Sequence, residues 1–187
     1  SPDLPCTLAA APLAHFSDTA QAAPDAFIWE FSQQGVRKWA TYYAGDSADF
    51  GVDCAVDRLG NLYVTGSTGS SNFPTQQLAG AYWQPANGGA TDAFVLRFNS
   101  QGVRQWATYY GADGNDFGTA IASDSTDQVY VAGYTASTNL NLADPGGGAY
   151  YQPSLNGASD SFILRFNALG AMVWGTYHGG DSGEQAL

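Results

Sequence analysis

Carboxylates gather in short glycine-rich segments of this sequence and are the first candidates for chemistry. Asp46 and Asp49 form one pair, and Asp113 and Asp116 form a second pair with the same spacing. Clustered oxygens can coordinate Ca²⁺, which takes about six to eight hard ligands. Neither segment has the spacing of an EF-hand loop, and the same residues could cap their own turns. Calcium binding and turn capping both stay open, and no other cofactor is predicted.

The remaining reactive side chains do not form a catalytic pattern. His15 and His178 are the only histidines, and neither has a partner at a spacing typical of a metal site or a nucleophilic triad. We therefore predict that the protein is not an enzyme. Cys6 and Cys54 are the only cysteines, and they predict one disulfide, with two buried thiols as the alternative.

Two pairs of aromatic residues are candidates for ligand binding. Tyr82-Trp83 and Tyr150-Tyr151 each precede a Gln-Pro dipeptide. Exposed rings on a loop offer a large rigid surface for carbohydrate or protein. Because the pairs recur at equivalent positions, packing over the edge of a sheet is the competing interpretation.

The composition excludes several classes of protein. Six basic residues stand against 17 acidic ones, which gives a net charge of -11, and Lys38 is the only lysine. Nucleic-acid binding needs a basic surface and is not expected. Aromatic residues make up 14% of the chain, so disorder is not expected either. No apolar stretch is long enough for a membrane span, and the single lysine among many Ser, Thr, Asn and Gly residues favours an extracellular or cell-surface location.

An internal repeat organises these residues. The segment DAFIWEFSQQGVRKWATYYAGDSADFG begins at Asp25, returns as DAFVLRFNSQGVRQWATYYGADGNDFG from Asp92, and returns again from Asp160. Trp39, Trp106 and Trp174 keep the same spacing. A repeat of this length indicates an architecture built from stacked copies of one supersecondary unit.

Each copy has the periodicity of β-strands. Phe94, Leu96 and Phe98 alternate with Val95 and Arg97, and a turn ending in Gly102 leads into VRQWATYY. A second pair of strands follows around TAIAS and QVYVAGY, separated by an Asp-rich turn. Four short strands in each copy are the plan of a β-propeller blade.

These motifs resemble a known family of repeats. The order W-A-T-Y-Y-G, N-D-F-G, VYVAG and Y-Q-P is similar to the SBBP-type β-propeller repeat of bacterial secreted and surface proteins. The resemblance covers residues 25 to the C-terminus and implies the fold. It supplies no catalytic residues to carry over, so it implies no activity.

We therefore expect an all-β, propeller-type repeat of about two and a half four-stranded antiparallel blades, open rather than closed into a ring. The predicted boundaries are an N-terminal arm at 1–24, blades at 25–91 and 92–159, and a half-blade at 160–187. An incomplete blade exposes strand edges and apolar side chains, which invite another chain to pair there.

The half-blade leads to the functional prediction. We expect an extracellular structural protein that assembles with copies of itself into a filament, with the arm as a complementing segment. The predicted assembly interface is Phe162, Leu164, Phe166 and Trp174. The alternative is a module of a larger secreted propeller that binds carbohydrate or another surface protein.

Overall fold

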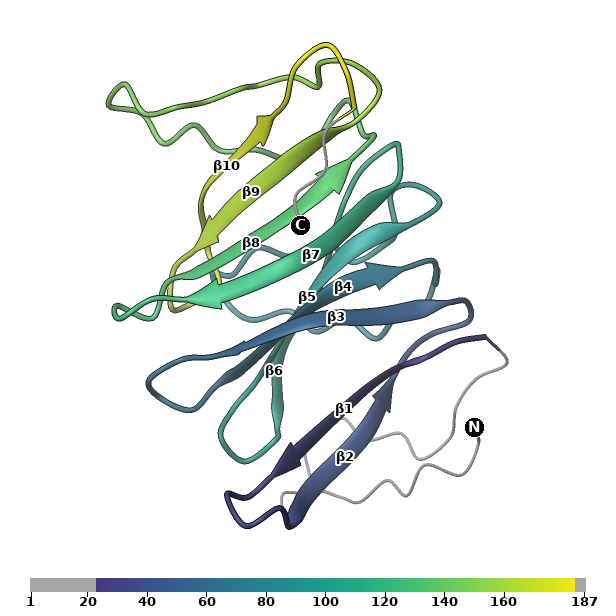
Figure 1. The fold of residues 1–187 in the computed structure, drawn as a ribbon, viewed down its shortest axis with the longest axis vertical. Helices are drawn as coiled ribbons and strands as arrows, with labels where there is room; N and C mark the ends of the chain where they lie inside the picture. Colours follow the sequence, from purple (N-terminus) through teal and green to yellow (C-terminus); the bar gives the residue numbers. More distant parts are fainter. Residues whose placement is uncertain (1–22, 184–187) are drawn as a thin grey trace.

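The structure is a computed structural model that describes residues 23–183, and these residues form β-strands and loops without a helix (Figure 1). The strands in chain order are β1 (Ala26–Phe31), β2 (Arg37–Tyr43), β3 (Asp49–Val56), β4 (Leu62–Thr68), β5 (Asp92–Phe98), β6 (Arg104–Tyr110), β7 (Asp116–Ser123), β8 (Val129–Thr135), β9 (Asp160–Phe166) and β10 (Met172–His178).

The strands form three antiparallel sheets. One sheet has two strands, β1-β2, and two sheets have four strands, β3-β4-β5-β6 and β7-β8-β9-β10. Figure 1 shows the three sheets stacked along the long axis, with β3–β6 between the other two. The predicted all-β architecture of two and a half sheets, open rather than closed into a ring, is confirmed.

The boundaries of the sheets differ from the predicted blades. Strand β4 pairs with β5 along its whole length, from Leu62 opposite Phe98 to Thr68 opposite Asp92, although residues 69–91 separate the two strands in sequence. The complete sheets therefore comprise residues 49–110 and 116–178, and not 25–91 and 92–159. The incomplete sheet is β1–β2 at the N-terminal end, whereas the predicted half-blade at 160–187 contains β9 and β10 of a complete sheet.

Each complete sheet consists of two β-hairpins, which we name by their order in the chain. The leading hairpins are β3–β4 and β7–β8, and the trailing hairpins are β5–β6 and β9–β10. Strands β1 and β2 form a third trailing hairpin, and no leading hairpin accompanies it among residues 23–183. In the trailing hairpin β5–β6, Gly102 has a φ of 76° and its N–H donates to Asn99 O, so glycine fits the predicted turn.

The long loops run along the outer strands instead of separating the sheets. In the loop 69–91, Gln76 exchanges two backbone hydrogen bonds with Ala107 of β6, of 2.9 and 3.0 Å. In the loop 136–159, Ala143 O accepts from Gly175 N–H of β10 at 3.0 Å. Each loop thereby protects the edge of a sheet that would otherwise be free to pair with another chain.

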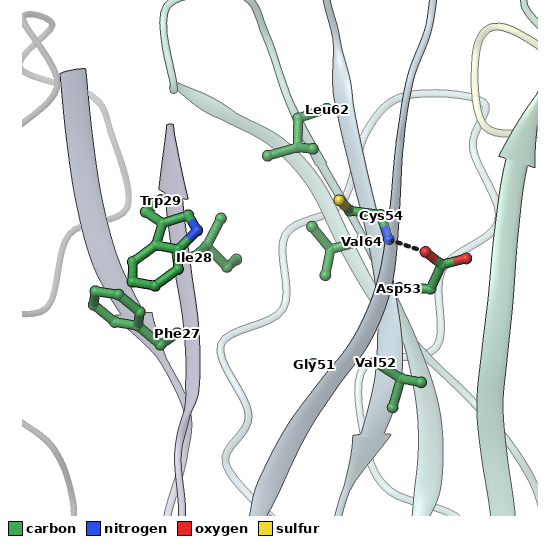
Figure 2. Close-up of a pocket in the computed structure, with 9 residues that line it drawn as sticks. All are labelled: Phe27, Ile28, Trp29, Gly51, Val52, Asp53, Cys54, Leu62 and Val64. Carbon is green, nitrogen blue, oxygen red and sulfur yellow. Dashed lines mark hydrogen bonds between the residues drawn. The ribbon is translucent and has the colours of Figure 1, made fainter. Parts of the chain in front are cut away.

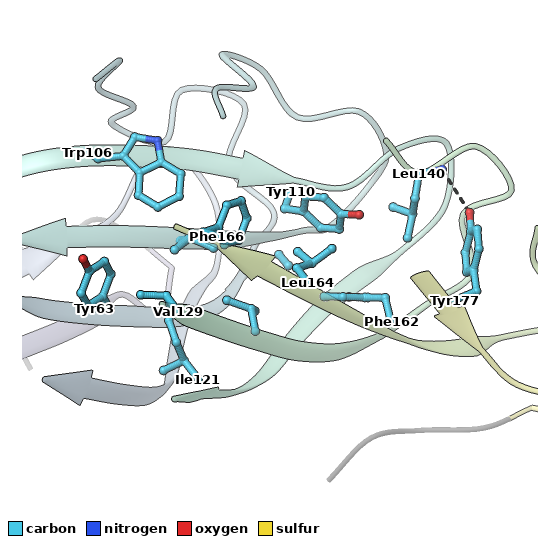
Figure 3. Close-up of a cluster of buried hydrophobic side chains, with 13 residues drawn as sticks. Tyr63, Trp106, Tyr110, Ile121, Val129, Leu140, Phe162, Leu164, Phe166 and Tyr177 are labelled. Carbon is cyan, nitrogen blue, oxygen red and sulfur yellow. Dashed lines mark hydrogen bonds between the residues drawn. The ribbon is translucent and has the colours of Figure 1, made fainter. Parts of the chain in front are cut away.

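Apolar side chains fill both junctions between sheets. Figure 3 shows the cluster between the two four-stranded sheets, which combines Trp106 and Tyr110 of β6 with Ile121 of β7 and Phe166 of β9. A second cluster joins Ile28, Trp39 and Tyr43 of the two-stranded sheet to Phe94, Leu96 and Phe98 of β5. The sheets thus hold together by stacking, as in other repeat folds.

Candidate functional site

The predicted assembly interface is wrong for three of its four residues, because these three belong to the core. Phe162, Leu164 and Phe166 are fully buried in the cluster between the four-stranded sheets, and Trp174 is half-buried on β10. Strand β9 lies between β8 and β10, so its side chains already have neighbours on the side that the prediction left open. Phe162, Leu164 and Phe166 therefore cannot face a second chain without unfolding the sheet.

Tyr82 and Trp83 have different environments. The ring of Tyr82 packs against Tyr110 and Phe166, with centroids 5.8 and 6.2 Å apart, so it bridges the two four-stranded sheets. Its N–H also donates to Gly170 O in the neighbouring sheet at 2.9 Å. Tyr82 therefore packs, as the competing interpretation held, while Trp83 is exposed.

Tyr150 is the repeat counterpart of Tyr82 but has no further sheet against it among the described residues. Its side chain is 59% exposed, and its hydroxyl donates to Gln152 Oε1 at 2.9 Å. The ring meets His178 edge-on at 5.3 Å, and neighbouring Tyr151 is half-buried. The exposure of Tyr150 therefore follows from its position in the last sheet and does not by itself indicate a ligand.

Asp46 and Asp113 bind groups of a neighbouring loop. The carboxylate of Asp46 accepts from the hydroxyl and the N–H of Ser71 at 2.7 and 2.8 Å, and that of Asp113 accepts from the same two groups of Thr138, both at 2.8 Å. These hydrogen bonds lower the pKa of both carboxyl groups. The two side chains thus act as clamps between loops.

Asp49 and Asp116 are buried at the first position of β3 and β7. Asp49 accepts from Gly45 N–H at 2.7 Å and from the Ser70 hydroxyl at 2.8 Å. Asp116 accepts from Ala112 N–H at 2.9 Å and from the Ser137 hydroxyl at 2.7 Å. Burial raises the pKa of both groups. Turn capping accounts for these contacts, and within residues 23–183 no three acidic, His or Cys side chains come together as a metal site.

Asp92 opens β5 and organises the preceding loop. Its carboxylate accepts from Gln84 Nε2 at 2.8 Å and from Gly88 N–H at 2.9 Å. The side chain is fully buried, and burial raises its pKa to about 6, with the charge of Asp116 adding to the shift. Asp92 is therefore a structural acid at the junction where β5 and β7 begin.

Cys54 has a free, exposed thiol on β3. The predicted disulfide is therefore not supported, and its other member, Cys6, lies outside the described residues, as do His15 and almost all of the arm at 1–24. The counterpart of Cys54 is Ile121, which is buried.

An open apolar groove lies between β1 and the leading hairpin β3–β4 (Figure 2). Phe27, Ile28 and Trp29 of β1 line one wall, and Val52 and Cys54 of β3 lie across from them. The cavity measures about 240 Å³. The complete lining is Phe27, Ile28, Trp29, Gly51, Val52, Asp53, Cys54, Leu62 and Val64.

Within residues 23–183, the groove is open because β3 has no hairpin over it, whereas β7 has one. Gly51 and Cys54 are exposed on β3, whereas their counterparts on β7, Gly118 and Ile121, are buried. The cover of β7 is the leading hairpin β3–β4: Asp53 Oδ2 accepts from Ile121 N–H at 2.9 Å, and the Ser123 hydroxyl donates to Val56 O at 2.9 Å. No described hairpin takes that position over β3.

Strand β1 shows the same contrast with β5 and β9. Trp29 is 57% exposed and Phe31 is 46% exposed, whereas their counterparts Leu96 and Phe98 are fully buried. Strand β5 pairs with β4 and β6, but β1 pairs only with β2 among the described strands. The site is thus an open strand edge next to an exposed strand face, which is a surface suited to β-strand addition.

Sequence reasoning placed the incomplete sheet at residues 160–187, whereas the structure has it at β1–β2. The signal that could have located it is the length of the links between strands, because the links 44–48 and 111–115 are short and the loops 69–91 and 136–159 are long. The long loops fold back over their own sheets, whereas the short links pass from one sheet to the next.

Comparisons with known proteins agree with the repeat architecture. Residues 38–74 and 105–141 match the family model described as SBBP, Beta-propeller repeat. The chain is also 26% identical over 168 residues to an uncharacterized WD repeat-containing protein of Acanthamoeba polyphaga mimivirus. That match covers 86% of this chain and 12% of the viral protein, so the chain spans about one eighth of its relative's length. In residues 23–183 there is no helix of the length and hydropathy needed to cross a membrane. Two segments of the chain thus match a β-propeller repeat, in agreement with its stacked antiparallel sheets.

Proposed function

We propose that this chain is a non-enzymatic repeat module that binds protein through the groove between β1 and β3 and serves in structural assembly outside the cell. The observation that carries the proposal is the contrast between the exposed strand β3 and its covered counterpart β7. Apolar surface of this kind, next to an unpaired strand edge, favours association with another polypeptide.

The acidic candidate residues have structural roles in the loops. The four predicted calcium ligands, Asp46, Asp49, Asp113 and Asp116, accept hydrogen bonds from loop groups around them. The extracellular part of the proposal rests on the low content of charged residues, 12%, and on the resemblance to secreted repeat proteins.

We infer a protein partner and not a carbohydrate, because two of the four aromatic candidates, Tyr82 and Tyr150, have another explanation. Tyr82 packs between sheets, and Tyr150 occupies the same position in the last sheet. The groove between β1 and β3, by contrast, offers backbone groups along a strand edge, which recognise a polypeptide and not a sugar.

A selection from displayed peptides tests the proposal. A library of peptides of about 25 residues would be selected on the immobilised chain, and each binder would then be measured against two variants. Val52→Glu places a charge in the groove, and Leu169→Glu places the same charge in the exposed β9–β10 turn.

We expect most binders to lose about tenfold or more in affinity for Val52→Glu, because a charge opposes burial of the groove, and to bind Leu169→Glu unchanged. Circular dichroism would verify that both variants are folded. Binders that are insensitive to Val52→Glu would contradict the groove as the preferred protein-binding surface.

A further inference from the structure

We infer a site of spontaneous covalent modification in the loop 136–159: the side chain of Asn156 converts to aspartate and isoaspartate by reaction with the backbone of Gly157. The sequence contains two Asn-Gly dipeptides, at 87–88 and at 156–157. Both lie in the long loops along the outer strands, so they can be compared within one molecule. The inference does not depend on the groove between β1 and β3.

The reaction consumes water and releases ammonia. A base in solution removes the proton of the Gly157 N–H, and the nitrogen attacks Cγ of Asn156. The bond between Cγ and Nδ2 breaks, and Nδ2 takes up a proton and leaves as ammonia, so a succinimide ring remains. Water then opens the ring at either carbonyl, which gives aspartate or, after attack at the backbone carbonyl, isoaspartate. Glycine favours the first step because it has no Cβ and its backbone is permissive.

The reacting groups of the dipeptide Asn87-Gly88 are fixed by hydrogen bonds. Gly88 N–H donates to the buried carboxylate of Asp92 at 2.9 Å. The Asn87 side chain accepts from Gly89 N–H at 3.0 Å and donates to Thr68 O at 3.4 Å. The attacking nitrogen must give up a bond to a charged acceptor, and the amide must rotate out of both of its own bonds. The folded structure therefore slows the reaction at Asn87.

The second dipeptide is displaced by one position in the repeat. Asn156, and not the glycine that follows it, is the counterpart of Gly88. The buried carboxylate of Asp160 accordingly accepts from Asn156 N–H, at 2.9 Å. The hydrogen bond that holds the attacking nitrogen in the first dipeptide thus falls on the preceding residue in the second.

The groups that react at Asn156-Gly157 are not restrained in this way. Among residues 23–183, neither the Gly157 N–H nor the Asn156 side chain makes a hydrogen bond. Leu155 replaces Asn87 of the first loop, so the side-chain oxygen that would accept from Gly157 N–H is missing. Oδ1 of Asp160 is buried and accepts no hydrogen bond from the described residues either. Asn156 is exposed, so water and base reach it.

The products change both the charge and the backbone of the loop. Each conversion adds a negative charge to a chain whose net charge is -11, so anion exchange separates the products from the unmodified chain. Isoaspartate also routes the backbone through the side-chain carbon of residue 156. The chain is thereby lengthened directly after the N–H that Asp160 holds.

The test follows both asparagines in the full chain during incubation at mildly alkaline pH. Proteolytic digestion and mass spectrometry measure the aspartate and isoaspartate formed at each position, and a parallel incubation in urea gives the rates without the folded loops. Two variants change the same residue. Leu155→Asn supplies the missing side-chain oxygen, and Leu155→Ala removes the same apolar contact without supplying it. Circular dichroism would verify that both variants are folded.

In the folded chain, we expect Asn156 to convert about tenfold or more faster than Asn87, because only Asn87 must break hydrogen bonds to reach the transition state. In urea the two asparagines should convert at similar rates. Leu155→Asn should slow the conversion of Asn156, whereas Leu155→Ala should not.

Three results would overturn the inference. The first is equal conversion of Asn87 and Asn156 in the folded chain. The second is an Asn156 that stays unmodified in the folded chain while it converts in urea. The third is equal conversion of Asn156 in Leu155→Asn and Leu155→Ala, which would show that the unrestrained N–H of Gly157 is not the cause.

Discussion

Strands β3 and β7 are two copies of one strand, and they have opposite environments. Both begin with a buried Asp followed by Phe and Gly, and both pair with the next strand in the same register, including the irregularity after Gly51 and Gly118. They differ in whether the leading hairpin of a neighbouring sheet lies over them. Strand β7 is covered by β3–β4, whereas β3 has no described hairpin over it and lines an open groove.

The comparison of β3 with β7 indicates that the burial of a strand depends on the neighbouring repeat and not on the strand's own sequence alone. The same strand is a core element at one position and an open surface at another. In a stacked repeat, each unit supplies one half of each junction, so a strand is buried only where a neighbouring unit lies against it. Matched substitutions at equivalent positions can measure this dependence directly.

The largest effect is expected from removing an aromatic side chain at the covered junction. Phe166→Ala should lower the free energy of unfolding by about 3–5 kcal/mol, because the buried ring packs against Trp106 at 5.4 Å. Its counterpart Phe31→Ala should cost less than about 1 kcal/mol, because that ring is exposed. Urea unfolding of both variants measures the difference, and similar losses would show that β1 is covered in solution.

A smaller effect is expected from pH at the covered junction. Burial raises the pKa of Asp92 from 3.8 to about 6, so between these values the folded state holds a proton that the unfolded state has lost. Stability should therefore fall as the pH rises from 4 to 7, by up to about 3 kcal/mol for this group alone.

Buried Asp49 and Asp116 also have raised pKa values and act in the same direction. The variant Asp92→Asn cannot titrate, so its stability should change less with pH over this range, as urea unfolding at several pH values would measure. The opposite dependence is expected only at lower pH, where Asp124, with its pKa lowered to about 2 by Thr126 and Gln128, loses its charge. If the free energy of unfolding of Asp92→Asn fell with pH as steeply as that of the wild type, Asp92 would not be the source of the pH dependence.

Much of the fold could be predicted from the sequence, because local patterns determine it. Alternation of Phe94, Leu96 and Phe98 predicted a strand, and the turn ending in Gly102 predicted a hairpin. The Asp-rich turn predicted between the second pair of strands is confirmed, since Asp124 accepts backbone N–H groups of Thr126 and Gln128 in that turn.

The grouping of hairpins into sheets could not be predicted from the repeat. In a periodic sequence, the boundary between one repeat and the next can be set at any position of the unit. The pairing of β4 with β5 across residues 69–91 depends on contacts between residues distant in sequence. The exposure of β3 was hidden for a related reason: Phe50 and Gly51 are the same residues as Phe117 and Gly118, so their sequence carries no sign of the missing cover.

The smallest of these effects on stability is expected at the shared glycine, Gly51 on β3 and Gly118 on β7. Because the residue is the same in both strands, the comparison measures only the effect of a hairpin lying over the strand. Gly118→Ala should destabilise the chain by about 1–3 kcal/mol, because the new Cβ must displace the backbone of β4. Gly51→Ala should be neutral or slightly stabilising, since its Cβ meets only ordinary contacts and alanine restricts the unfolded chain. Thermal and urea unfolding of the two variants at low protein concentration would measure the difference. If Gly51→Ala lost as much stability as Gly118→Ala, β3 would have to be covered within a single chain, and the groove would not be available to a partner.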